Sequence, residues 1–214
     1  MDRTVKRRAY DNTRRLELTR ATRAEVVAAA QRLFVADGFP ATTVESIAEA
    51  SQTPVATVYR LFGSKRSILL AVLDVAFGGD DEPVPFHERP VVRAALAEPD
   101  PGKLLDAFAR LCRELLDRSA AIQHVLAGAA AADPDAAAVL ATSREQRYTG
   151  QSRIARALAD RHALPDGMTR TKAADLIYTL MSPELHRILT VERGWSPSRY
   201  ETWLATTLRA QLLG

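Results

Sequence analysis

The chain has 214 residues, 47% hydrophobic and 26% charged, with a formal net charge of +3, which is ordinary for a folded protein with a buried core. Its single cysteine, Cys112, excludes an internal disulfide framework and fits a reducing compartment. No run approaches the roughly 20 apolar residues of a membrane span, and no apolar run follows the basic first residues as in a secretory signal. We therefore expect a soluble cytoplasmic protein.

The first 23 residues are the most basic part of the chain, with eight arginines or lysines and three acidic residues. Residues 1–18 lack a regular apolar stripe, so we expect a flexible basic arm there. A basic arm before a nearly neutral body suits a polyanion such as nucleic acid. A disordered tail that only aids solubility has the same composition, and charge alone does not separate the two.

Apolar residues at helical spacing predict a first helix from Thr22 to about Asp37. Thr22 and Glu25 have the spacing of a capping box, and Gly38 suits the left-handed conformation that ends a helix. A second, short helix is predicted within 42–51, with a threonine as its N-cap.

A corner at Gln52, Thr53 and Pro54 separates this helix from the next. Threonine is a good N-cap, and proline at the first helical position loses no hydrogen bond because that N–H is unpaired anyway. We therefore predict that Pro54 opens a helix over 54–62, followed by another over 64–77.

Beyond residue 77 the pattern is helical to the end, without the alternation typical of strands, so the predicted fold class is all-α. The segment 78–90, dense in glycine, proline and acid, is expected to be a linker. Pro183 lies inside a helical pattern and predicts a kink or break. The predicted helices cover 88–98, 101–118, 120–131, 134–163, 169–191 and 196–213.

Two short helices joined by a close corner suit a helix-turn-helix, in which the second helix lies in the DNA major groove. Val58 and either Leu61 or Phe62 would face inward. Small outward residues allow close approach to DNA, and Tyr, Arg and Lys donate to phosphates or base edges. An ordinary structural corner has the same pattern. The outward candidates are Val55, Ala56, Thr57, Tyr59 and Arg60, with Lys65 just beyond.

Two longer runs make the pattern more specific. They are A-x-x-L-F-x-x-x-G-F-x-x-T-T-V-x-x-I-A and T-V-Y-R-x-F-G-S-K, both within residues 26–74. At this spacing, about fifty contiguous residues resemble the DNA-binding domain of tetracycline-repressor (TetR) type transcriptional regulators. The resemblance implies a three-helix helix-turn-helix domain, a linking fourth helix, and a larger all-helical C-terminal domain that binds a ligand and forms the dimer.

On this plan the expected domains follow the chain in order. They are a basic arm at 1–18, a DNA-binding domain at 19–77 with its linking helix at 64–77, a linker at 78–90, and an effector-binding and dimerisation domain at 91–214.

The resemblance also implies particular DNA contacts. Thr43 matches the family's phosphate-contacting threonine, and Thr57, Tyr59 and Lys65 match positions that touch the DNA backbone or base edges. Arg60 is a further candidate. The corner departs from the family's usual Gly-Val-Ser, and its proline removes an N–H that could bind phosphate. The arm that precedes the first helix in the family corresponds here to Arg14, Arg15, Arg20 and Arg23.

In the C-terminal domain, an effector pocket is expected among the central helices, and the last two helices suit a four-helix dimer bundle. The same side chains also suit simple core packing. The pocket candidates are Phe108, Leu111, Cys112, Leu115, His124 and Tyr148. The dimer candidates are Leu176, Leu180, Leu185, Leu189, Trp203, Leu204 and Leu208.

The sequence holds no recognisable catalytic pattern: its four histidines lack metal-ligand spacing, and Cys112 lies in an apolar stripe. We predict a non-enzymatic homodimeric repressor that binds a near-palindromic double-stranded operator and is released by a small-molecule effector, with no cofactor, metal or membrane partner. The alternatives are an all-helical enzyme or a ligand-binding protein that uses the C-terminal domain without operator recognition, and a basic DNA-compacting protein.

Overall fold

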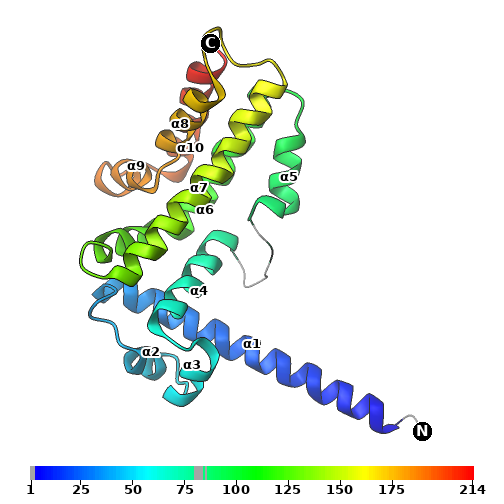
Figure 1. Cartoon of the computed structure of the whole chain (residues 1–214), viewed down its shortest axis with the longest axis vertical. Coiled ribbons are helices and arrows are strands. Elements are labelled where there is room, and N and C mark those ends of the chain that lie inside the picture. The colour runs from blue at the N-terminus through cyan, green and yellow to red at the C-terminus, as the bar shows by residue number, and fades with distance from the viewer. Residues whose placement is uncertain (1–2, 80–83, 85) are drawn as a thin grey trace. The chain divides into compact units, whose positions relative to one another are not determined.

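The computed structural model describes residues 3–79, 84 and 86–214, and for residues 3–15 the backbone alone. Residues 80–83 and 85 of the predicted linker lie outside the described residues. The described elements are all helical, which confirms the predicted fold class (Figure 1). The chain divides into two compact units, Met1–Val72 and Leu73–Gly214.

The first unit begins with helix α1, which runs from Arg3 to Asp37. The predicted helix start at Thr22 is therefore wrong, and the segment predicted as an arm is helical from Arg3. The cause is local composition, because residues 3–37 contain no glycine or proline and are rich in arginine and alanine. The Thr22 hydroxyl caps nothing and instead donates to the Leu18 carbonyl, 3.0 Å away.

Helices α2 (Val44–Ala50) and α3 (Val55–Phe62) follow at the predicted places. Thr43 is the N-cap of α2 and forms a capping box with Ser46, in which each side chain accepts from the other's backbone N–H. The three helices share one small apolar core. Its buried side chains include Val26, Val27, Ala30, Phe34, Phe39, Ile47, Ala48, Val58 and Phe62.

The corner between α2 and α3 differs from the prediction by one residue. Pro54 is the N-cap and not the first helical residue, since its carbonyl accepts from the backbone N–H groups of Thr57 and Val58 at 2.8 and 3.1 Å. Thr53 caps no helix; it is buried, and its hydroxyl donates to the Ser51 carbonyl at 3.2 Å. Gln52 has φ = 52°, the left-handed region that favours glycine.

This backbone conformation leads to a prediction for Gln52, whose side chain is exposed. A non-glycine residue in the left-handed region costs about 1 kcal/mol or more, whereas glycine adopts it freely. Gln52→Gly should therefore raise the free energy of unfolding by up to about 1 kcal/mol, less the flexibility that glycine adds to the unfolded chain. Urea unfolding followed by circular dichroism measures the change; a loss of stability would contradict strain at this corner.

Helix α4 (Lys65–Gly78) contains the boundary between the units, and the second unit continues through a short 3₁₀ turn, η1 (Phe86–Glu88), to α5 (Pro90–Ala97). Two long helices, α6 (Pro101–Ala129) and α7 (Pro134–Asp160), then run side by side (Figure 1). The prediction of two helices within α6 is wrong, because Ser119 fits into the helix by donating its hydroxyl to the Leu115 carbonyl at 2.8 Å.

The last predicted helix pair contains the break expected at Pro183. Helix α8 (Arg170–Leu180) ends before it, Ser182 caps the short helix α9 (Pro183–Arg187), and a π-helical turn, η2 (Ile188–Glu192), follows. Helix α10 (Pro197–Leu212) closes the chain and packs on α6 and α8. The core of this unit is apolar. Its fully buried large side chains include Leu104, Leu105, Leu116, Ile154, Leu158, Tyr200 and Leu204.

Candidate DNA-binding face and effector pocket

Helix α3 has one buried and one exposed face, as predicted. Val58 and Phe62 are buried and Leu61 is half-buried, so these side chains fix α3 on the core. Tyr59 is 46% exposed, which leaves its ring and hydroxyl free to meet a partner. The outer face consists of Val55, Ala56, Tyr59 and Arg60, with Thr57 half-buried at its edge.

Lys65 lies at the start of α4, but its ammonium group points into the first unit. It donates to the carbonyls of Phe39 and Thr42, both at 2.9 Å, and lies 4.4 Å from the centroid of the Phe39 ring. An ammonium group has three N–H donors, and the third finds the Pro40 carbonyl at 3.5 Å. In this structure, therefore, Lys65 stabilises the loop between α1 and α2 by hydrogen bonds to its backbone carbonyls.

The predicted arm arginines lie on α1. The side chains of Arg14 and Arg15 lie outside the described residues, and Arg20 is exposed. Arg23 is half-buried and donates to the Leu61 carbonyl at 3.4 Å, with its guanidinium 4.4 Å from the centroid of the Phe62 ring. It thus joins α1 to the last turn of α3, where a cation is favourable.

Of the six predicted pocket residues, only His124 lines the pocket described below. Phe108, Leu111 and Cys112 are buried in the core of the second unit, and Leu115 and Tyr148 pack against that core. Burial raises the pKa of the Cys112 thiol to about 12, which does not suit a nucleophile. The sixth residue, His124, is exposed and lines a pocket elsewhere on α6.

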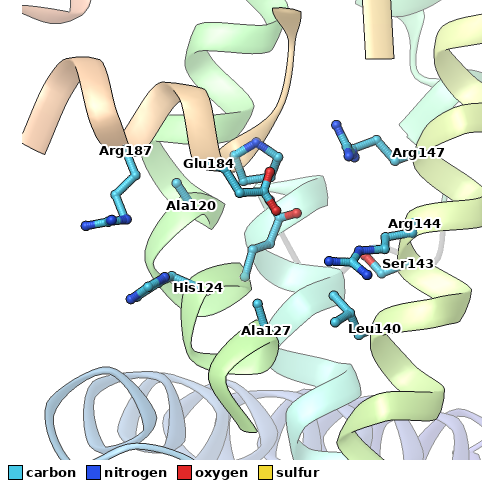
Figure 2. A pocket seen from close by; sticks show the side chains of 11 residues that line it. Ala120, His124, Ala127, Leu140, Ser143, Arg144, Arg147, Glu184 and Arg187 are labelled. Carbon is cyan, nitrogen blue, oxygen red and sulfur yellow. The ribbon is translucent and has the colours of Figure 1, made fainter. Parts of the chain in front are cut away.

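This pocket lies between α6, α7 and α9 (Figure 2). It is partly open to solvent, and its volume is ≈ 40 Å³, whereas pockets for drug-sized ligands span about 300–1,000 Å³. Arginine is its most frequent charged residue, which sequence spacing did not indicate because the arginines come from two helices, α7 and α9. The lining residues are Ala120, Gln123, His124, Ala127, Leu140, Ser143, Arg144, Arg147, Pro183, Glu184 and Arg187.

The predicted dimer residues divide into two groups. Leu204 and Leu208 are 0% and 1% exposed and belong to the core of their own chain. The remaining five are half-buried on α8, α9, η2 and α10, which leaves part of each side chain for a second protomer. They are Leu176, Leu180, Leu185, Leu189 and Trp203.

A buried polar group lies between α6, α9 and α10. His186 Nε2 is 3.1 Å from Asp117 Oδ1, and the His186 ring packs edge-on against Tyr200 with centroids 4.7 Å apart. Burial lowers the pKa of His186, and Asp117 opposes that shift. Among the described residues, His186 Nδ1 is buried without a hydrogen-bond partner, and the buried Tyr200 hydroxyl has only the weak Cys112 thiol beside it.

The weakly paired hydroxyl predicts the outcome of Tyr200→Phe. A buried polar group without a partner costs about 1–3 kcal/mol, and phenylalanine keeps the ring that packs on His186. The free energy of unfolding should therefore rise by about 1 kcal/mol, measured by urea unfolding. Trp203→Phe is the control, a conservative change at a neighbouring aromatic residue whose ring centroid lies 5.9 Å from that of Tyr200. Its free energy of unfolding should not rise. A large loss of stability in Tyr200→Phe would reveal a hydrogen bond at this hydroxyl.

Within the described residues, no helix has the length and apolar character needed to cross a membrane. The same part of the chain holds no cluster of three or more His, Cys, Asp or Glu side chains placed to bind a metal ion.

The fold and the α3 face define a helix-turn-helix protein with a helical C-terminal unit. Residues 26–72 match the family described as "Bacterial regulatory proteins, tetR family". The HTH-type transcriptional regulator TcmR of Streptomyces glaucescens is 39% identical over 75 residues, which are 34% of this chain and 33% of that protein. The family match thus covers the helix-turn-helix region, and the chain spans only about a third of the length of the curated relative it matches.

Solved structures extend the likeness to nearly the whole chain. A complex of SmeT with triclosan has a TM-score of 0.69 at 16% identity and covers 91% of this chain and 92% of that one. NalD, the secondary repressor of the MexAB-OprM multidrug efflux pump in Pseudomonas aeruginosa, has a TM-score of 0.65 at 18% identity. The match covers 90% of this chain and 97% of that one. At these identities the likeness shows the fold.

Proposed function

We propose that the chain is a homodimeric transcriptional repressor that binds a near-palindromic DNA operator and is released by a small-molecule effector. The observation that carries this proposal is the α3 face. Val58 and Phe62 anchor the helix on the core, while Tyr59 and Arg60 stay exposed together with small neighbours that admit the DNA backbone. The proposal includes a cytoplasmic location and no enzymatic activity.

Three relatives support this proposal. TcmR is a transcriptional regulator, NalD is a repressor, and SmeT has been solved with the small molecule triclosan. Each of these facts belongs to that protein, and the proposal extends them to a chain with the same fold.

In the proposed mechanism, two copies of α3 lie in successive major grooves, about one helical turn or slightly more apart. The effector binds the C-terminal unit and favours a dimer in which that spacing no longer matches the operator. The half-exposed leucines and Trp203 would form the dimer surface.

Selection of bound fragments from a random DNA pool tests the function directly. We expect enrichment of one near-palindromic sequence and a dimer in light scattering at micromolar concentration. If no palindrome is enriched, operator recognition is refuted, and a monomer under these conditions would refute the dimer.

Deletion of residues 1–18 is the test for the basic segment, and it removes six arginines or lysines and three acidic residues. If these cations lie on phosphates, operator affinity falls, and the slope of log K against log salt flattens by about 0.9 for each phosphate that is no longer neutralised. Fluorescence anisotropy at several salt concentrations measures both quantities. An unchanged slope would show that residues 1–18 do not contact phosphates and are a helical extension that aids solubility.

A further inference from the structure

The pocket between α6, α7 and α9 has an excess of positive charge. Three arginines, Arg144, Arg147 and Arg187, line it against a single carboxylate, Glu184. A bound cation would meet three guanidinium groups, so the charges of this lining favour an anion.

The three arginines differ in what they already bind. Arg147 donates to the Tyr178 carbonyl at 2.9 Å and lies 3.6 Å from the centroid of the Tyr178 ring. Arg187 is paired with Glu192.

Arg144 is the arginine left for a ligand. It is exposed and makes no hydrogen bond or ion pair with any residue that the structure describes. Figure 2 shows its side chain extending from α7 across the pocket toward α6. Its guanidinium N–H donors thus have no acceptor among the residues described by the structure.

The rest of the lining adds both polar and apolar side chains. Ser143, beside Arg144, and Gln123, on the facing helix, add polar groups that can donate to an oxyanion. The remaining side chains are small or apolar and offer no partner to a second charge. They are Ala120, Ala127, Leu140 and Pro183.

We infer that this pocket binds a small carboxylic acid, with Arg144 holding the carboxylate and the apolar residues covering a short hydrocarbon body. A planar guanidinium matches a carboxylate in a two-pronged hydrogen bond. The apolar part of the lining favours such an acid over inorganic phosphate, and the small volume of ≈ 40 Å³ favours a compact one. In taking this pocket as the effector site, the inference rests on the proposed function.

Isothermal titration calorimetry on the full chain, without DNA, tests the ligand class. The probes are hexanoate, hexanol, hexylamine and inorganic phosphate. We expect hexanoate to bind at least about tenfold more tightly than the other three, because hydrogen bonds to charged groups are the strongest that a site can offer. Equal or tighter binding of hexanol, hexylamine or phosphate, or no binding of hexanoate, overturns the inference.

Three variants test the residues. Arg144→Gln should weaken hexanoate binding about tenfold or more, whereas Arg156→Gln, at an exposed arginine of the same helix outside the pocket, should not change it. Glu184→Gln removes the only carboxylate of the lining and should tighten binding. Equal affinities for Arg144→Gln and Arg156→Gln overturn the role of Arg144.

The two proposals fail separately. A chain that enriches a palindromic operator but does not bind hexanoate would contradict the ligand class alone. A chain that binds hexanoate through Arg144 but enriches no DNA sequence would contradict the repressor and leave a carboxylate-binding protein. Where both hold, hexanoate should release the wild-type chain from its operator in fluorescence anisotropy, and Arg144→Gln should need about tenfold more.

Discussion

Replacing both Tyr59 and Arg60 by alanine should weaken operator binding at least about 30-fold. Removing one side chain that binds a phosphate or base edge costs about 1–3 kcal/mol, and removing two costs about 2 kcal/mol or more. Both side chains are exposed, so the fold of the first unit should be unaffected. Fluorescence anisotropy with the selected operator measures the affinity, and thermal unfolding by circular dichroism checks the fold.

Arg32→Ala is the matched control for this experiment, because Arg32 is an exposed arginine of α1 in the same unit. It removes one positive charge without touching α3. Operator affinity that falls equally in the control would indicate a general effect of charge. Unchanged affinity in the Tyr59 and Arg60 double variant would show that α3 does not contact the DNA.

Lys65→Met should destabilise the first unit by about 1.5–3 kcal/mol. The ammonium group donates to the carbonyls of Phe39 and Thr42, and hydrogen bonds from charged donors are worth about this much. Methionine keeps most of the apolar stem but leaves these carbonyls without their donor. Urea unfolding measures the loss, with Lys103→Met at an exposed lysine of α6 as the control.

The same variant separates a structural lysine from a DNA-contacting one. If Lys65 only fixes the loop between α1 and α2, stability falls and the salt dependence of operator binding is unchanged under conditions where the variant stays folded. If Lys65 binds a phosphate, stability is retained and the salt slope flattens by about 0.9. The distances within the first unit support the structural role.

The sequence predicted best what depends on neighbouring residues. The cap-and-proline pairs Asp100-Pro101, Asp133-Pro134 and Ser196-Pro197 each begin a helix, since an N-cap side chain and a proline act within one turn. The buried Val58 and exposed Tyr59 of α3 follow equally from helical periodicity.

Contacts between distant residues were not predictable in this way. The bond from Lys65 to Phe39 spans 26 residues, and nothing in the local pattern of either segment indicates it. Arg144 and Glu184 likewise meet at one pocket only because α7 and α9 pack beside α6. Helix α1 was missed at its start for another reason: helix propensity continues through residues 3–21 without an apolar stripe.

The buried state of Cys112 has a practical consequence for experiments on α3. It is the only cysteine of the chain, and burial with a pKa of about 12 keeps it a neutral, inaccessible thiol near neutral pH. Maleimide dyes react with accessible thiolates, so the native chain should not be labelled. A cysteine introduced at Ala56 would carry a single fluorophore on the exposed face of α3, without first removing the natural thiol.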